Sequence, residues 1–360
     1  MSSFARLVAL SLQNQPSAGS FSAESYLRTG LALEFLGTGS AKPTKLRNVS
    51  STALHFPGGT FLFDCGDGTL RQTHGSQTCP SKIDSIFITH LHGNHCCGLP
   101  GMTLAISEAR KEKPKTFIYG PRGLSGMFGE SIRRRSFVVK ELTSGLTSSN
   151  SELITMKDGC FEIFNNVRFR VRAVPIRHST FCVGYVIEEL KSKPDSIDKR
   201  KLKEQYGVES GPLLHQLERG QIITTDDGVR VNPEDVATSM RLPRKIVILG
   251  DTYDAGPITE LAMDADVLVH EATFLDEEKT IAARLSHSTA GMAGAFAKRI
   301  KAKNLVLSHF SPRTDYTNND DERSAERSRR QARTTFGNEN VFAAKDGWIF
   351  SVPYNIKSSN

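Results

Sequence analysis

Three histidines follow an apolar run in the first third of the chain, and they constrain its fold more than any other feature. The run is Ser85–Ile88, and His90, His92 and His95 come directly after it. Its β-branched and aromatic residues suit a buried strand. His90 and His92 point the same way in extended backbone, whereas Gly93 lets the chain turn before His95. Imidazole is the commonest metal ligand in proteins and a regular ligand of zinc. The stretch therefore predicts a metal site at a strand end, in preference to a loop of solvated histidines.

The same arrangement recurs later in the chain. Three more strand-like runs end close to a residue that can bind a metal ion. These residues are His178, Asp251 and His309. In layered α/β folds, functional groups gather at one sheet edge, where loops from several strands converge. We therefore expect these side chains to meet the first three histidines at such an edge.

The histidine segment resembles the His-x-His-x-Asp-His motif of the metallo-β-lactamase superfamily, with Asn94 in the place of the aspartate. Two other segments narrow the resemblance to tRNase Z, the tRNA 3′-processing endonucleases. They are the Pro-x-Lys-x-Arg-Asn loop at residues 43–48 and the His-Ser-Thr segment at residues 287–289. Further matching segments follow in the expected order between residues 31 and 353, at 36–40, 62–69, 119–121, 250–251, 270–273 and 308–310.

The resemblance implies a four-layer αββα sandwich of the mixed α/β (α+β) class, formed by residues 31–355, with the site along the shared edge of its sheets. It also implies an inserted arm at residues 188–240 that grips tRNA away from the site. Between residues 191 and 203 this segment has six lysines and arginines and two aspartates. A polar insertion of this kind between core strands is expected to protrude, although a surface hairpin without RNA contacts has the same composition.

The resemblance implies two zinc ions per subunit, for which Mn²⁺ or Mg²⁺ can substitute. The implied ligands are His90, His92 and His178 for the first ion, Asn94, His95 and His309 for the second, and Asp251 as a bridge. Asp64 would hydrogen-bond to the ligands and orient them. Paired divalent ions make hydroxide available at neutral pH and stabilise the attacking and leaving oxygens of a phosphodiester. His287, oriented by Glu271, is the implied acid that protonates the departing ribose oxygen.

The implied activity is removal of the 3′ trailer from precursor tRNA, by a cut after the discriminator nucleotide that leaves a 3′-hydroxyl. Asn94 departs from this pattern, because the family has an aspartate there that binds the second ion and acts as a base. An amide is neutral and cannot take up the proton, and loss of a general base typically costs about 10²–10⁴ in rate. We therefore expect binding of precursor tRNA with slow cleavage. The sequence fits a natural and an engineered replacement equally.

Two other functions stay open. A non-catalytic tRNA-binding paralogue with a decayed metal site is supported by Asn94, but the six other implied ligands are all present. A phosphodiesterase that acts on small diesters or cyclic nucleotides would have the same histidine motif. Such an enzyme does not need a basic arm, so the arm argues against this alternative.

Basic residues supply the expected contacts with RNA. The net charge of +7 suits a polyanionic partner. In the family, the loop at residues 43–48 handles the acceptor end of tRNA, which points to Lys45 and Arg47, although a solvated basic turn is equally compatible. In the arm, phosphate contacts are expected from Lys199, Arg200 and Lys201, and these would raise affinity without choosing a sequence. The resemblance further implies a homodimer.

The remaining features concern the location of the protein. No apolar run approaches the roughly 20 residues of a membrane span, so no membrane contact is expected. Six cysteines without a Cys-x-x-Cys pair indicate reduced thiols in an intracellular protein, and Cys96 and Cys97 are expected to pack rather than to bind metal. Residues 1–30 hold two arginines, many serines and a single acid. This composition fits a mitochondrial or plastid transit peptide as well as an unstructured tail; without import we expect a place in the cytoplasm or nucleus.

Overall fold

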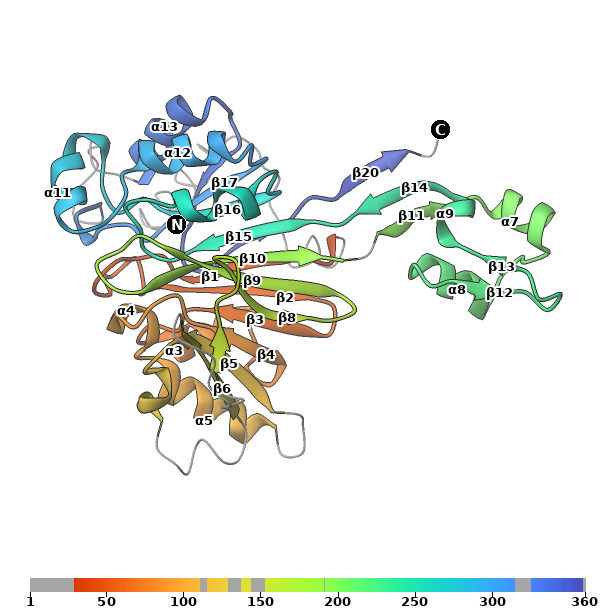
Figure 1. Cartoon of the computed structure of the whole chain (residues 1–360), viewed down its shortest axis with the longest axis horizontal. Helices are drawn as coiled ribbons and strands as arrows, with labels where there is room; N and C mark the ends of the chain where they lie inside the picture. Colours follow the sequence, from red (N-terminus) through yellow and green to blue (C-terminus); the bar gives the residue numbers. More distant parts are fainter. Residues whose placement is uncertain are drawn as a thin grey trace, which may run out of the picture.

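The computed structural model describes residues 29–110, 115–128, 137–143, 153–190, 192–314 and 325–358. Within these ranges, two large β-sheets pack face to face (Figure 1). In sheet order, the first sheet contains β19 (Trp348–Ser351), β1 (Ala32–Gly37), β2 (Ser51–Phe56), β3 (Gly59–Phe63), β4 (Ile83–Phe87), β5 (Thr116–Pro121), β6 (Phe137–Thr143) and β7 (Leu153–Thr155). The second contains β18 (Val341–Ala343), β17 (Leu305–Ser308), β16 (Val267–Glu271), β15 (Lys245–Leu249), β10 (Cys182–Glu189), β9 (Phe169–Ile176) and β8 (Phe161–Asn165).

Both sheets combine antiparallel and parallel pairing in the same way. Strands β1 to β3 and strands β8 to β10 with β15 are antiparallel, whereas β3 to β7 and β15 to β18 are parallel. Parallel neighbours send their carboxyl ends to the same edge of a sheet. A backbone hydrogen bond joins the two sheets at this edge, because Val183 N–H in β10 donates to Thr89 O after β4 (3.0 Å).

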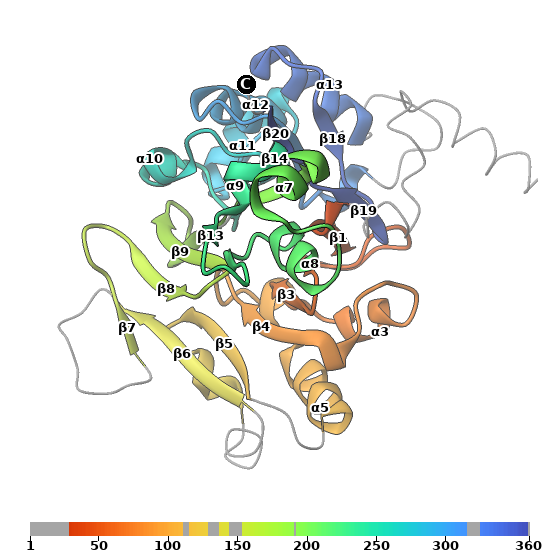
Figure 2. The same cartoon turned by 90° about the vertical axis from the view of Figure 1, so that its right-hand side faces the viewer.

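Helices cover the outer face of each sheet, which confirms the four-layer αββα sandwich. Helices α3 (Thr69–Thr73) and α5 (Leu99–Ala109) lie on the first sheet, and α12 (Ala290–Arg299) and α13 (Ala325–Phe336) lie on the second (Figures 1 and 2). The close contact of α12 with α13 requires Gly294, since a Cβ atom there would lie 2.2 Å from Ala332 O. The other helices of the sandwich are short: η1 (Pro80–Lys82), α4 (Gly93–Cys96), η2 (Leu124–Met127), η3 (Gly256–Ile258), α10 (Thr259–Ala262), η4 (Asp276–Glu278), α11 (Lys279–Arg284) and η5 (Pro312–Thr314).

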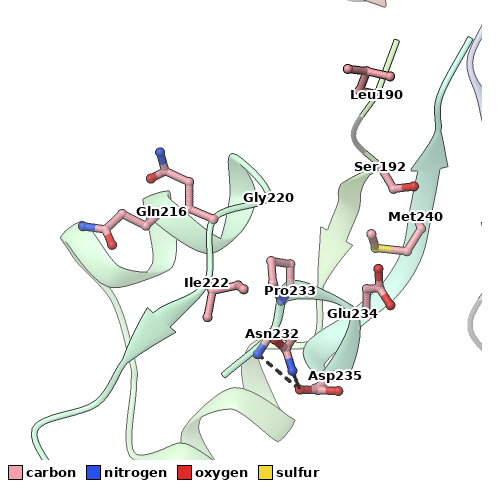
Figure 3. A pocket seen from close by; sticks show the side chains of 11 residues that line it. Leu190, Ser192, Gln216, Gly220, Ile222, Asn232, Pro233, Glu234, Asp235 and Met240 are labelled. Atoms are coloured by element: carbon pink, nitrogen blue, oxygen red, sulfur yellow. Dashed lines mark hydrogen bonds between the residues drawn. The ribbon is translucent and has the colours of Figure 1, made fainter. Parts of the chain in front are cut away.

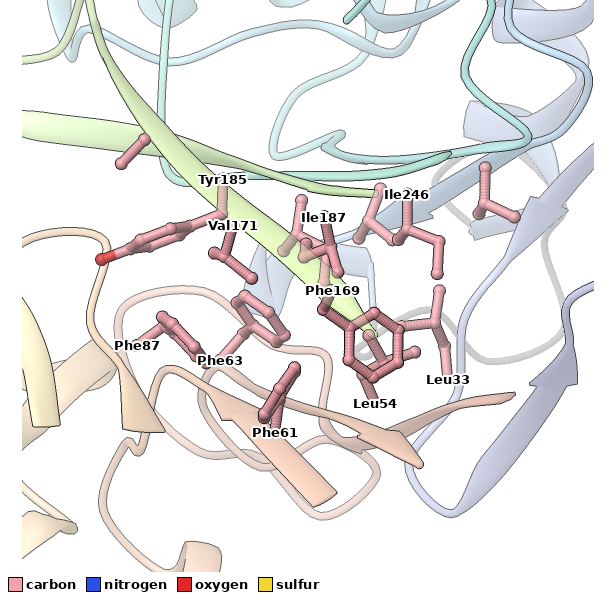
Figure 4. Close-up of a cluster of buried hydrophobic side chains, with 14 of the residues drawn as sticks. Leu33, Leu54, Phe61, Phe63, Phe87, Phe169, Val171, Tyr185, Ile187 and Ile246 are labelled. Atoms are coloured by element: carbon pink, nitrogen blue, oxygen red, sulfur yellow. The ribbon is translucent and has the colours of Figure 1, made fainter. Parts of the chain in front are cut away.

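An aromatic core between the sheets holds their inner faces together (Figure 4). The rings of Phe63 and Phe87 stack with centroids 4.9 Å apart, and Tyr185 meets Phe87 edge-on at 5.4 Å. A buried tyrosine hydroxyl needs a hydrogen-bond partner, and Tyr185 donates to Ile88 O (2.8 Å). This bond fixes the chain two residues before His90, so core packing also positions the first part of the site.

Between β10 and β15 the chain leaves the sandwich and forms a protruding arm (Figures 1 and 2). Its stalk is the antiparallel pair β11 (Lys193–Ile197) and β14 (Ala237–Leu242), to which the C-terminal strand β20 (Asn355–Ser358) adds. The outer part contains α7 (Lys199–Tyr206), α8 (Pro212–Glu218), β12 (Ile223–Thr224), β13 (Arg230–Val231) and α9 (Pro233–Val236). These elements enclose an apolar cluster of their own around Leu202 and Leu217. A cavity of about 770 Å³, lined in part by Gln216, Ile222 and Met240, separates α8 from β14 (Figure 3).

Three expectations bear on the location of the protein. No described helix has both the length and the apolar character that a membrane crossing needs. All six cysteines are free thiols. The transit peptide or tail expected at residues 1–30 lies, apart from residues 29 and 30, outside the described residues.

Candidate metal centre

The first sheet contributes His90, His92, Asn94 and His95. Strand β4 ends at Phe87, and His90 follows in a fully buried position. The short helix α4 begins at Gly93 and carries Asn94 and His95, and its first turn is closed by a hydrogen bond from His95 N–H to His92 O (2.9 Å). One strand end and one helical turn therefore send these side chains to the same edge, as the spacing predicts.

The second sheet contributes His178, Asp251 and His309. His178 lies in the turn between β9 and β10, Asp251 follows β15, and His309 follows β17. His309 has a φ of 57°, a left-handed conformation that only the surrounding structure can hold in a residue other than glycine. The next residue supplies that restraint, since Phe310 N–H donates to Thr38 O (2.8 Å) and Phe310 O accepts from Ser40 N–H (2.9 Å).

These side chains form two clusters that share Asp251. One cluster contains His90, His92, His178 and Asp251, the other contains His95, Asp251 and His309, and the ligand atoms within each lie no more than 4.8 Å apart. Asp251 Oδ2 lies 3.6 Å from His90 Nε2 and 3.4 Å from both His95 Nε2 and His309 Nε2. Imidazole nitrogen and carboxylate oxygen are the donors that zinc prefers. The donor set therefore fits two divalent cations bridged by one carboxylate.

Hydrogen bonds at Nδ1 orient three of the imidazoles so that Nε2 faces the cluster. His95 Nδ1 contacts Asp64 Oδ2 (2.7 Å), and His178 Nδ1 contacts Ser286 O (2.7 Å). His309 Nδ1 contacts Thr273 Oγ1 (2.9 Å). A proton held on Nδ1 by such a partner leaves the Nε2 lone pair free for a cation. Asp64 was expected in this position from the sequence, but Ser286 was not, because a backbone carbonyl leaves no signal in the sequence.

Burial and the carboxylate of Asp251 act in opposite directions on the imidazoles of the centre. Burial lowers the pKa of His95, but Asp251 and Asp64 outweigh it and raise this pKa to about 10. Burial lowers the pKa of His309 to about 4. Asp251 is itself fully enclosed, yet the imidazoles around it hold its pKa well below the usual value. A buried carboxylate of this kind needs positive charge beside it, from protons or from a cation.

Asn94 reaches the second cluster. Its carboxamide nitrogen lies 3.2 Å from His309 Nε2, and its side chain is half-buried. Position 94 therefore lies next to His309, one of the ligands expected for the second ion. The amide brings a hydrogen-bond donor to a nitrogen that a cation would need, and it brings no negative charge.

A buried carboxylate orients His287 beside the two clusters. His287 Nδ1 lies 3.0 Å from Glu271 Oε2, and Glu271 also accepts a hydrogen bond from Thr252 N–H (2.6 Å). Burial lowers the pKa of His287, but the charge and hydrogen bond of Glu271 raise it to about 9. An imidazole that keeps its proton at neutral pH can act as a general acid. His287 Nδ1 lies 3.9 Å from Asp251 Oδ2, so this acid stands next to the shared ligand.

The two basic residues of the loop at 43–48 have different environments. Lys45 is exposed, whereas Arg47 is only 8% exposed. The Arg47 guanidinium lies 4.4 Å from the centroid of the Phe310 ring and donates to Thr38 Oγ1 (2.6 Å) and Ala344 O (2.8 Å). RNA contact by Arg47 stays a prediction. What the contacts do establish is that Arg47 ties the loop to the residue that follows His309.

The other sequence-predicted residues lie away from the clusters. Lys199, Arg200 and Lys201 are exposed on the first turn of α7 in the arm, and Arg200 pairs with Glu204 (2.8 Å). Cys96 is buried and donates to His92 O (3.2 Å), and burial raises its pKa to about 12. Neither Cys96 nor Cys97 belongs to a metal-ligand cluster among the described residues.

The chain is similar to several known proteins. The family model described as "Anti-Pycsar protein Apyc1" matches residues 31–191. The ribonuclease Z of Bacillus velezensis is 36% identical over 314 residues, which cover 86% of this chain and 96% of that protein. The crystal structure of human tRNase Z, short form, aligns with a TM-score of 0.61 at 28% identity, over 89% of this chain and 99% of the human chain. The metallo-β-lactamase-fold protein YhfI from Bacillus subtilis aligns with a TM-score of 0.59 at 16% identity, over 89% of this chain.

Proposed function

Because this chain belongs to the tRNase Z family of tRNA 3′-processing endoribonucleases with the metallo-β-lactamase fold, we propose that it cuts precursor tRNA directly after the discriminator nucleotide and leaves a 3′-hydroxyl. The observation that supports this reaction best is the pair of clusters joined by Asp251, with His287 beside them. Two sites for cations and a positioned acid can together catalyse in-line hydrolysis of a phosphodiester.

Two zinc ions are the cofactors that we propose, with Mn²⁺ or Mg²⁺ as substitutes. The first would be held by His90, His92, His178 and Asp251, and the second by His95, His309 and Asp251, with position 94 beside it. Zinc at such a site acts as a Lewis acid and makes hydroxide available near neutral pH.

Side chains of the protein would protonate the leaving oxygen and hold the ligands in position. Glu271 holds the charged form of His287 through Nδ1, which leaves the Nε2 proton for the ribose oxygen that departs. Asp64, bonded to the backbone N–H and hydroxyl of Thr89, keeps His95 in place (2.8 and 3.0 Å). These groups are positioned by buried hydrogen bonds before any substrate arrives, which limits reorganisation during the reaction.

Asn94 is expected to slow the cleavage of precursor tRNA. Its carboxamide can neither accept the proton of an attacking water nor neutralise a second cation, so we expect cleavage that is slower by about 10²–10⁴ than with a general base. The same observation would suit a tRNA-binding paralogue without activity. Elemental analysis separates the two, because a decayed centre would not retain stoichiometric zinc.

The proposed RNA contacts extend from the site to the arm. Lys45 would meet the acceptor end, and Lys199, Arg200 and Lys201 would meet phosphates elsewhere on the tRNA, with Arg47 holding the loop from below. A homodimer is proposed as the working form, so that the arm of one subunit can serve the site of the other. An intracellular protein is proposed, located in a mitochondrion or plastid if residues 1–30 are a transit peptide and otherwise in the cytoplasm or nucleus.

The decisive experiment is cleavage of a 3′-extended precursor tRNA by the zinc-supplemented protein, with both product ends mapped. We expect one cut, after the discriminator nucleotide, and weaker tRNA binding after alanine replacement of Lys199, Arg200 and Lys201. A second candidate is a phosphodiesterase of small diesters, because the histidine motif taken alone would suit such an enzyme equally well. Hydrolysis of a small chromogenic diester without any cut in precursor tRNA would favour that candidate.

A further inference from the structure

A cavity of about 380 Å³ opens beside the metal centre without including any of its expected ligands. Four separate segments form it: the loop at residues 40–42, the residues after β16, the turn between α11 and α12, and the residues after β17. His287 lines this cavity as well as flanking the clusters. The cavity therefore begins where the proposed acid meets the leaving oxygen.

Its walls are mainly apolar, and two basic residues, Lys42 and Arg313, also line it. Ala41, Phe274, Leu285 and Pro312 provide the apolar surface, and Leu285 is 46% exposed there. The guanidinium of Arg313 lies 5.6 Å from the centroid of the Phe274 ring. Lys42, also in the lining, is exposed. Apolar and aromatic walls beside exposed cations form the kind of surface on which a nucleobase stacks next to its phosphate.

We propose that this cavity, called the base cavity below, holds the nucleobase of the discriminator nucleotide. The inference rests on the proposed function, because it takes the ribose that carries the leaving 3′-oxygen to lie within hydrogen-bond reach of His287. The base on that ribose must then occupy neighbouring space, and the base cavity is the space that shares His287. Lys42, which is exposed in the lining, is the cation that would meet the phosphate on the 5′ side of the same nucleotide.

Two polar side chains that line the base cavity are already paired within the protein. Discrimination between bases requires free donors and acceptors at their edges. Thr273 in the lining is already bonded to Glu271 and His309, and the Arg313 guanidinium is paired with Glu278 (3.2 Å). Stacking on apolar walls tolerates every base. We therefore expect all four discriminator bases to be accepted, with loss of the base itself weakening binding.

The first test measures binding of tRNA that ends at the discriminator nucleotide, with that nucleotide either intact or abasic. Stacking of one base is worth about 5- to 150-fold in affinity, so the abasic tRNA should bind more weakly by that factor. An abasic site in the preceding nucleotide serves as the RNA control. Equal affinity for the intact and abasic tRNA would refute the proposal that the base cavity holds the discriminator base.

The second test fills the base cavity with Leu285→Trp, which should weaken binding of intact tRNA and remove the difference between intact and abasic tRNA. Leu104→Trp is the matched control, because Leu104 is a similarly exposed leucine (52%) on α5. A Leu285→Trp protein that still distinguishes intact from abasic tRNA refutes the assignment. Cleavage of intact precursor tRNA is measured in parallel. Absence of cleavage would refute the proposed function. Cleavage together with equal affinity for intact and abasic tRNA would refute only the assignment of the base cavity.

Discussion

Replacement of Asn94 by aspartate is the perturbation that tests the chemistry most directly. The carboxamide already lies 3.2 Å from His309 Nε2, so a carboxylate of the same size reaches the second cluster without a backbone shift. It supplies a group that can accept the proton of the attacking water and a fourth donor beside His95, Asp251 and His309. We expect single-turnover cleavage to rise by about 10²–10⁴, which corresponds to a barrier lower by about 3–5 kcal/mol.

The assay is cleavage of end-labelled precursor tRNA with the protein in excess, together with zinc content by elemental analysis. Asn94→Ala is the matched control, since it removes the amide without adding a base or a ligand, and it should not accelerate cleavage. Affinity for tRNA should stay unchanged in both variants, because the arm is untouched. If Asn94→Asp cleaves no faster than the parent and retains no more zinc, the reasoning about position 94 is refuted.

Three further outcomes follow from the structure. Because Glu271 raises the pKa of His287 to about 9, cleavage should persist until the pH passes about 9 and then fall; Glu271→Gln should move this fall to lower pH, and a pH–rate profile checks it. Burial raises the pKa of Glu34, but hydrogen bonds from His55, a backbone amide and a hydroxyl outweigh it and lower the pKa, so this group stabilises the fold above pH 4.5 and the contribution is lost as the pH falls through the folded-state value. Glu34→Gln should therefore lower the free energy of unfolding by about 1–3 kcal/mol at neutral pH and less in acid, as denaturant titrations at several pH values would show. Arg47→Ala should lower zinc content along with stability, because Arg47 packs against the residue after a metal ligand, whereas Lys45→Ala should weaken tRNA binding and leave zinc content unchanged; the opposite result would assign the loop differently.

The fold and the family could be predicted because their signals are local. The spacing of His90, His92 and His95 after a strand encodes the directions of their side chains, and these directions survive in the folded chain. The replacement of the motif's aspartate by Asn94 could also be read from the sequence, because it concerns one residue at a defined position of the motif. The spacing gives the directions of the side chains, whereas the family, its fold and the significance of Asn94 come from the resemblance to tRNase Z.

Other properties depend on which segments the sheets bring together, and no single segment carries that information. From the sequence of the loop, Lys45 and Arg47 are equally good candidates for RNA contact. Tertiary packing distinguishes them, because it places Phe310 against Arg47 and leaves Lys45 in solvent. The carbonyl of Ser286 behind His178 is a second example, as is the base cavity, which four segments enclose. The sequence by itself determined the type of site and its chemical weak point. The tertiary structure decided which groups support it, since burial and distance between remote segments are set by sheet order and core packing.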